Sequence, residues 1–145
     1  MRRKKTISTI LQLKDSRKKE LEIEVKQASD KVDTEISRLH ALEKDYSDSL
    51  DCFSEKNSEG TLDIHNLNSY YDYFSRINGR ISEQKENHKQ CENELKSLKS
   101  SLVSAYRDKK AFEILHDKAV KKDQKEKSDS EQKESDFRAM TRRSK

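Results

Sequence analysis

Apolar residues recur along the first part of the chain at the spacing of one helical face. They are Leu21, Val25, Ala28, Val32, Ile36, Leu39, Leu42, Tyr46, Leu50 and Phe53. Successive members lie three or four residues apart, which gathers them on one side of an α-helix. A less regular continuation reaches back to Ile7, Ile10 and Leu11. The pattern predicts a helix from about residue 6 to about residue 55.

The second part of the chain has a longer and more regular stripe, in which steps of three and four residues alternate. Its positions are Leu67, Tyr70, Phe74, Ile77, Ile81, Gln84, His88, Cys91, Leu95, Leu98, Leu102, Ala105, Lys109, Phe112, His116 and Ala119. A sustained period of about 3.5 residues is typical of a left-handed coiled coil. We predict a second helix over about 62–140. Gly79 interrupts it, either to let another surface approach closely or as a tolerated residue.

Turn signals separate the two stripes at residues 56–61. Asn57 and Gly60 tolerate the positive φ of a helix C-terminus, Thr61 is suited to cap the next helix, and Asp63 suits its positive dipole end. The predicted fold is all-α: an antiparallel two-helix coiled-coil hairpin with a longer, protruding C-terminal helix. We expect residues 1–145 to form this single domain.

A fold about residue 58 would place residue i opposite residue 116 − i, so the first helix would run out opposite about residue 110. Phe112 and Leu115 would then be the last core residues of the second helix. A helix without a partner should be polar on every side, and residues 121–136 contain no apolar side chain. This segment either extends the second helix or frays when the protein is free.

The composition agrees with long exposed helices. Charged residues make up 41% of the chain, Pro is absent, and 32 basic residues against 28 acidic ones leave a net charge of +4. The two signs are interspersed, with basic clusters at Arg2–Lys5 and near the C-terminus. No apolar stretch is long enough for a signal or a bilayer span, so we expect a cytoplasmic protein. Cys52 and Cys91 are expected to be small core residues, too far apart for a disulfide.

The sequence offers no catalytic constellation, no phosphate-binding glycine loop and no cluster of His and Cys at metal-ligand spacing. The four histidines are scattered. Two helices are not expected to build a concave site of several hundred Å³. We therefore expect a protein that is not an enzyme, with no catalytic residue, cofactor, metal or small-molecule substrate.

Four aromatic residues fall within Tyr70–Phe74 near the predicted turn. One partner helix cannot cover all of them, because neighbouring residues point about 100° apart. Tyr73, Ile77 and Gln84 form a ridge beside the apolar seam. The ridge is either a protein-docking site or a set of side chains that pack over the seam edge, and the residues alone favour neither.

The segment YYDYFSRINGRISEQ at residues 70–84 and the C-terminal KESDFRAMTRRSK resemble the FliJ/YscO family of type III secretion central stalks. Size, the two-helix layout and the position of the turn also fit. The resemblance implies a non-enzymatic component of the flagellar export apparatus. Its paired helix termini would enter the pore of a hexameric export ATPase, its rod would point towards the export gate, and it would help to handle export chaperones. The protein would lie at the flagellar base, peripheral to the cytoplasmic face of the inner membrane.

The family's contact with the gate membrane protein maps onto Tyr73, Ile77, Arg80 and Gln84. Arg80 and Gln84 depart from the family pattern, which has a small residue and a His at these positions. For the ATPase ring we expect contacts at Phe137, Arg138 and Met140 in the C-terminal extension and at Ile10 and Leu11 near the N-terminus.

Two other functions fit the pattern. An unrelated coiled-coil scaffold or adaptor would share the stripes, and a nucleic-acid-binding hairpin could use the basic ends. Interspersed carboxylates argue against the second, because they repel phosphates along most of the helices, so no nucleic acid partner is expected. Flagellar export and injectisome export both use such a stalk, and the residues do not separate them.

Overall fold

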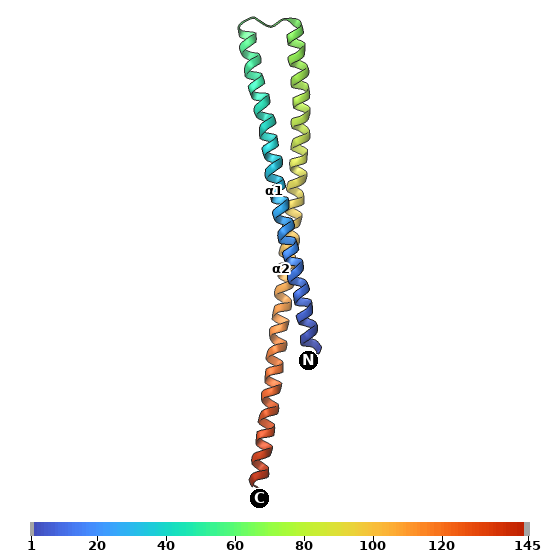
Figure 1. Ribbon diagram of the computed structural model, residues 1–145, viewed down its shortest axis with the longest axis vertical. Helices are drawn as coiled ribbons and strands as arrows, with labels where there is room; N and C mark the ends of the chain where they lie inside the picture. The colour runs from blue at the N-terminus through green and yellow to red at the C-terminus, as the bar shows by residue number, and fades with distance from the viewer. Residues whose placement is uncertain (1, 144–145) are drawn as a thin grey trace. The chain divides into compact units, whose positions relative to one another are not determined.

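The structure is a computed structural model that describes residues 2–143. It has two α-helices, α1 (Arg2–Ser58) and α2 (Ile64–Arg143) (Figure 1). The described residues contain no β-strand. The all-α class is thus confirmed. α1 runs a few residues further at both ends than the sequence pattern predicts, whereas α2 starts two residues later and ends three residues later than predicted. Coiled-coil packing between them stays a prediction.

Backbone contacts group the chain into two compact units, and α1 and α2 contribute to both. We call residues 22–100 the turn unit, and residues 1–21 with residues 101–145 the terminal unit. Each unit is described on its own below.

In the turn unit, Gly60 ends α1. Its φ is +67°, and among residues 2–143 it is the only residue with a positive φ. The Gly60 amide donates to the Asn57 carbonyl at 3.2 Å, and the Thr61 amide donates to the Lys56 carbonyl at 3.2 Å. These two bonds are those of a Schellman motif, which satisfies the last carbonyls of a helix. Asn57 keeps a negative φ, so Gly60 alone supplies the left-handed residue.

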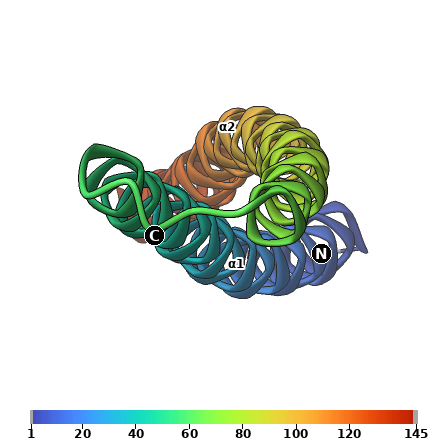
Figure 2. The same cartoon turned by 90° about the horizontal axis from the view of Figure 1, so that it is seen from above.

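Asp63 begins α2. Its carboxylate accepts a hydrogen bond from the Asn66 amide at 2.8 Å, which is the bond of an N-cap residue. The prediction that Thr61 caps α2 is wrong, because the Thr61 hydroxyl instead donates to the Lys56 carbonyl at 3.1 Å and closes the end of α1. Figure 2 shows the short connection passing from the end of α1 to the start of α2.

The predicted stripe of α2 matches the structure closely. Every one of its sixteen positions is buried or half-buried, including the polar Gln84, His88, Lys109 and His116. The stripe of α1 is also covered, except at Leu50, which is exposed. In the turn unit the most buried apolar residues are Ala28, Leu39, Ile77 and Cys91. The covered face of α2 was therefore readable from the spacing of apolar residues alone.

The predicted pairing of residues across the hairpin is wrong by several positions. In the turn unit Gln84 bonds to Glu35, whereas folding about residue 58 would place residue 81 there. In the terminal unit Lys109 bonds to Asp15, in place of residue 101. The cause is the turn, because α1 continues to Ser58 and α2 starts only at Ile64.

Cys52 is exposed, so the prediction that it is a core residue is wrong, whereas Cys91 is buried as expected. Both thiols are free. Cys52 comes directly before Phe53, which belongs to the stripe, so its side chain points about 100° away from the covered face. Its sulfur lies 3.8 Å from the Tyr70 hydroxyl.

Gly79 is exposed, and a Cβ added there would meet no atom within 4 Å. The structure thus gives no packing reason for glycine at this position. We expect Gly79→Ala to raise the free energy of unfolding by up to about 1 kcal/mol, because alanine loses less backbone entropy in a helix. Gly60→Ala is the matched control and should lower it by about 1 kcal/mol, because of the positive φ. Urea unfolding followed by circular dichroism measures both, and a destabilised Gly79→Ala protein would contradict this reading.

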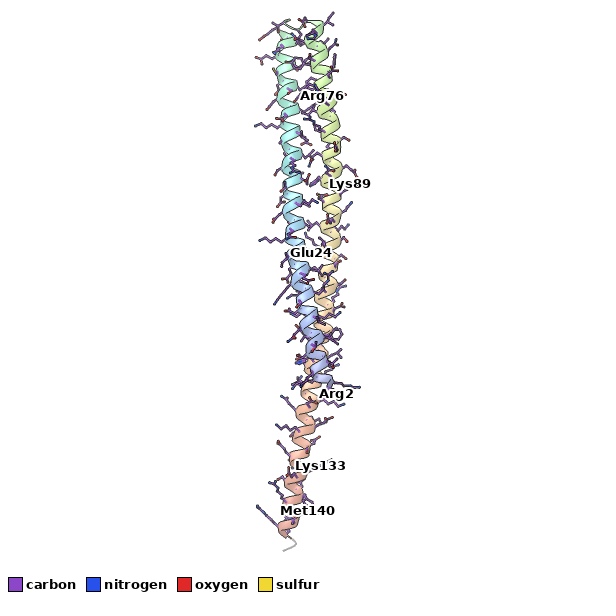
Figure 3. All side chains as sticks on the ribbon, turned by 45° about the vertical axis from the view of Figure 1, so that its right-hand side comes forward. Arg2, Glu24, Arg76, Lys89, Lys133 and Met140 are labelled. Atoms are coloured by element: carbon purple, nitrogen blue, oxygen red, sulfur yellow. The ribbon has the colours of Figure 1, made fainter. Side chains whose placement is uncertain are left out.

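In the terminal unit, α2 continues as a helix through Arg143, and residues 124–143 are all exposed. Figure 3 shows Lys133 and Met140 projecting from this part of α2. Of the two alternatives for the polar segment, the structure shows the continued helix. Leu115 is 49% exposed, so it is not the core residue predicted. Half-buried positions instead continue along α2 to Asp123, because α1 begins as early as Arg2.

Candidate protein-binding sites

The predicted gate-contact residues lie in the turn unit. Tyr73, Ile77 and Arg80 line one recess of about 270 Å³, together with Leu42, Asp45 and Arg76. Ile77 is only 5% exposed, Tyr73 is half-buried and Arg80 is exposed. The structure therefore brings three of the four residues together. Their exposure differs, because Ile77 is an apolar residue covered by its neighbours, whereas Arg80 places its charge at the surface.

Gln84, the fourth predicted residue, is engaged inside the turn unit. Its side-chain amide donates to the Glu35 backbone carbonyl at 3.0 Å and to the Glu35 carboxylate. Glu35 is 8% exposed, and Arg38 donates to the same carboxylate at 2.9 Å. A carboxylate covered to this extent needs such partners, so Gln84 contributes first to the contact between α1 and α2.

The aromatic residues near the turn form a cluster that joins the two helices. The ring centroids of Tyr46 and Phe74 lie 5.5 Å apart, and those of Phe53 and Tyr70 lie 5.2 Å apart. Tyr73 packs edge-on against Phe74 at 5.7 Å, whereas Tyr71 is exposed. Tyr73 thus packs over the seam edge and also lines the recess, whereas protein docking on the ridge stays a prediction.

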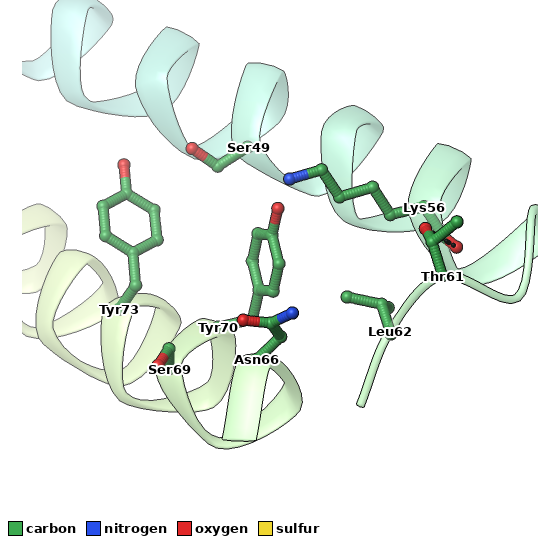
Figure 4. A pocket seen from close by; sticks show the side chains of 8 residues that line it. All are labelled: Ser49, Lys56, Thr61, Leu62, Asn66, Ser69, Tyr70 and Tyr73. Carbon is green, nitrogen blue, oxygen red and sulfur yellow. Dashed lines mark hydrogen bonds between the residues drawn. The ribbon is translucent and has the colours of Figure 1, made fainter. Parts of the chain in front are cut away.

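A second recess of about 560 Å³ lies between α1 and α2 beside the turn (Figure 4). Its wall is rich in hydroxyl groups and includes one amine; the lining residues are Ser49, Lys56, Thr61, Leu62, Asn66, Ser69, Tyr70 and Tyr73. The expectation that two helices cannot build a concave site of this size is wrong. Residues of α1, of α2 and of the connection between them all contribute to its wall.

Lys56 is the one basic residue in the wall of this recess. Its ammonium nitrogen lies 5.7 Å from the centroid of the Tyr70 ring. A side-chain hydrogen bond with Tyr70 raises the pKa of Lys56 above 10.5, so the amine stays charged at neutral pH. The recess therefore presents one fixed cation among neutral hydroxyl groups.

Asp15 is the centre of an ion-pair group in the terminal unit. Lys109 donates to its carboxylate at 2.7 Å, and Lys19 lies 3.1 Å from it. The bonds from Lys109 and then Lys19 lower the pKa of Asp15 from 3.8 to about 2, and the same contact raises the pKa of Lys109 above 10.5. Lys109 occupies a position of the apolar stripe, so Asp15 supplies the partner that a half-buried ammonium needs.

These shifts predict a pH dependence of stability. Because the pKa of Asp15 is lower in the folded chain, its stabilising effect is present above pH 4 and is lost as the pH falls towards 2. We expect Asp15→Asn to lower the melting temperature at pH 7 and to make little difference near pH 2. Asp129→Asn, on the exposed part of α2, should change it at neither pH. An equal effect of both substitutions at pH 7 would contradict a specific role for Asp15.

The predicted ATPase-contact residues lie in the terminal unit. Phe137 and Met140 are each 70% exposed, and Arg138 donates to Glu134 at 3.1 Å. Ile10 and Leu11 are half-buried. The first residues of α1 line a recess that reaches Glu126 on α2, and Phe137 lies roughly 16 Å beyond Glu126 at about 1.5 Å per residue. The structure therefore does not bring Ile10 and Leu11 together with Phe137 and Met140.

A family model described as Flagellar FliJ protein matches residues 3–144. The chain belongs to the FliJ family. Family membership gives it a role in flagellar protein export by type III secretion. Searches of curated proteins and of solved structures found no significant match.

The charges of this FliJ-family chain are distributed more unevenly than the basic clusters at its two ends indicate. The turn unit carries 11 Lys and Arg against 17 Asp and Glu, whereas the terminal unit carries 21 against 11. The charges are interspersed locally but segregated between the units. A count of charges for each predicted helix does not show this difference, because each helix contributes residues to both units.

Among residues 2–143, no group of His, Cys, Asp and Glu side chains is arranged to hold a metal ion. Within the same range, neither helix combines the length and the apolar character that a bilayer crossing requires.

Proposed function

We propose that this FliJ-family chain is a non-enzymatic central stalk and adaptor, which links the hexameric export ATPase to the export gate. The observation that carries the proposal is the exposed part of α2, residues 124–143, in a chain whose family belongs to flagellar export. Ordering an exposed helix that has no partner costs conformational entropy without any gain from packing, so a partner protein would explain this segment. Its two large apolar side chains, Phe137 and Met140, are available for a partner protein.

The ATPase contact is assigned to the terminal unit. Phe137, Arg138 and Met140 would form its apolar and basic tip, and Ile10 and Leu11 would support the helix pair behind it. Small apolar contacts on a charged helix suit a ring that must turn or release, because they do not lock the partners together through a large interface.

The gate contact is assigned to the turn unit. Tyr73 and Arg80 would meet the gate's cytoplasmic part, above the buried Ile77, and Gln84 would hold this surface by its bond to Glu35. Export chaperones are further partners in this proposal, and residues 1–145 act as one hairpin domain. The protein would then lie on the cytoplasmic side of the inner membrane at the flagellar base.

Binding assays with the purified export ATPase and the gate's cytoplasmic domain from the same genome test this function. We expect the full chain to bind each of them separately and both together, because the assigned surfaces lie in different units. Binding to neither protein would contradict the proposal and would favour a coiled-coil scaffold of another kind.

A further inference from the structure

In the terminal unit, the side of α2 that faces away from its covered stripe carries only basic and apolar residues along one line. Successive members are separated by four, three, four, four, three and four residues, so they stay within an arc of about 80° on the helix. Every member is exposed. We call this set the basic stripe; it consists of Val103, Arg107, Lys110, Ile114, Lys118, Lys121 and Lys125.

Carboxylates are almost absent from this side of the helix. Asp117 lies at the edge of the basic stripe. Among residues 2–143, none of the five cations of the stripe lies within 4 Å of a carboxylate oxygen, whereas Lys109 on the covered face pairs with Asp15. The other acidic residues of the stretch 101–125 lie about 100° or more from the centre of the stripe: Asp108, Glu113 and Asp123.

The apolar members of the stripe are exposed to water. Val103 is 48% exposed and Ile114 is 47% exposed, and the neighbouring Tyr106 is 46% exposed. Single exposed apolar residues are common, but here two of them share a line with five cations. The Lys18 ammonium of α1 lies 5.2 Å from the centroid of the Tyr106 ring and adds another cation beside this line. Basic and apolar side chains on one exposed face are typical of helices that lie on a membrane surface.

The shape of the basic stripe indicates which kind of partner fits. Residues 103–125 extend over about 33 Å at about 1.5 Å per residue, and a straight line of this length suits a flat, continuous surface. Lys and Arg stems can lie along lipid chains while their charged ends reach phosphate groups, so a bilayer satisfies the basic and the apolar members together. Nucleic acid would engage the cations alone and would leave Val103 and Ile114 without a contact.

We propose that the basic stripe binds the anionic surface of a lipid bilayer, with residues 103–125 of α2 lying in the membrane plane. Anionic headgroups pair with the five cations, and Val103 and Ile114 lie among the first carbons of the lipid chains. The terminal unit, with 21 basic against 11 acidic residues, is attracted to such a surface, because each cation near it strengthens binding about fivefold. This contact goes beyond the proposed function, which requires no lipid.

The first test is sedimentation of the full chain with vesicles of equimolar phosphatidylglycerol and phosphatidylcholine. Lys110→Glu with Lys121→Glu alters the basic stripe. Lys127→Glu with Lys133→Glu makes the same change of net charge at exposed positions of α2 outside the stripe. We expect the stripe pair to weaken binding by about 20-fold or more at low salt and the control pair by about twofold. High salt should reduce the difference, and circular dichroism checks that each variant is folded.

A second test asks which face of α2 meets the lipid. The chain contains no Trp, so a single introduced Trp is a specific fluorescence probe. Ile114→Trp places the probe on the basic stripe, and Ser101→Trp places it at an exposed position on another side of α2. With the same vesicles we expect the emission of Ile114→Trp to shift to the blue and to be quenched by brominated lipid. The emission of Ser101→Trp should stay unchanged.

Four results would overturn the inference. The wild type could fail to sediment with the anionic vesicles, or could sediment equally with vesicles of phosphatidylcholine alone. Equal losses for the two charge-reversal pairs would show a response to net charge without a specific face. Equal shifts of the two Trp probes would also exclude the stripe as the contact. Stronger stripe-dependent binding to duplex RNA or to polyglutamate than to the vesicles would assign the stripe to another class of partner. Because these assays contain no other protein, their failure leaves the proposed contacts with the ATPase and the gate untouched.

Discussion

Ile77→Ala is expected to lower the free energy of unfolding by about 2–3 kcal/mol, the lower part of the range for truncating a buried isoleucine. Ile77 is the most buried residue of α2 and lies under the surface formed by Tyr73 and Arg80. Its side chain fills the seam between two helices, where water can reach part of the cavity that truncation leaves. Urea unfolding of the wild type and the variant measures the difference.

The same substitution should weaken gate binding, but the cause would be the loss of packing beneath the contact. Arg80→Glu separates the two effects, because Arg80 is exposed and its replacement leaves the seam intact. We expect Arg80→Glu to weaken binding to the gate's cytoplasmic domain by about tenfold with an unchanged unfolding midpoint. Gly79→Ala, an exposed neighbour, serves as its binding control.

Two outcomes would contradict this division of roles. If Ile77→Ala unfolds at the wild-type urea concentration, Ile77 is not a core residue in solution. If Arg80→Glu binds the gate domain as tightly as the wild type, the gate contact lies elsewhere on the chain. A variant with two changes, Tyr73→Ala and Ile77→Ala, would not distinguish these cases, since it alters the surface and the core together.

The sequence predicted the helices and the covered face of α2 because both follow from a repeated local rule. Apolar side chains three and four residues apart must share a face, whatever the partner is. The pairing across the hairpin does not follow from that rule. It depends on where α1 ends. The hydrogen bonds around Gly60 determine that end, and the Thr61 amide and hydroxyl both donate to the Lys56 carbonyl of α1.

Polar residues within the stripe carried information that the reading left unused. Gln84 and Lys109 interrupt an apolar face, and each needs a polar partner across the seam. Glu35 and Asp15 are those partners. A search for a carboxylate on α1 opposite each polar interruption would have corrected the register of the hairpin. The burial of Glu35 was not predicted, because its neighbour Ile36 was taken as the core residue. In the structure Glu35 is the more buried of the two.

Recesses were beyond the reach of the sequence for a different reason. The recess beside the turn depends on which residues of α1, the connection and α2 come together, and the recess lined by the first residues of α1 depends on α1 starting opposite residues 115–126. Both are consequences of the pairing register. The exposed part of α2, by contrast, was predictable from its lack of apolar residues, and so was the isolation of Phe137 and Met140.

Deletion of residues 128–145 is expected to weaken binding to the export ATPase by about 100-fold, which makes it the largest effect on binding that we anticipate. The deleted segment is exposed throughout its described part, so its removal costs the terminal unit no packed contact. The deletion retains the ion-pair group around Asp15. It also retains the recess lined by the first residues of α1, since that recess extends only to Glu126 on α2. The unfolding midpoint should therefore stay at the wild-type value, and calorimetric titration should show the loss of affinity.

Phe137→Ser with Met140→Ser locates the effect within that segment. The two side chains lie three residues apart on neighbouring turns of α2 and together offer the largest apolar surface beyond the recess. We expect this pair of substitutions to weaken binding by about tenfold, and we assign the remaining tenfold of the loss to the charged residues around it. Ser130→Ala with Gln132→Ala changes polar side chains of the same segment and should leave affinity unchanged. Full affinity of the deleted chain would mean that the ATPase binds residues outside this segment, whereas equal losses from both pairs would mean that binding does not depend on the apolar side chains of Phe137 and Met140.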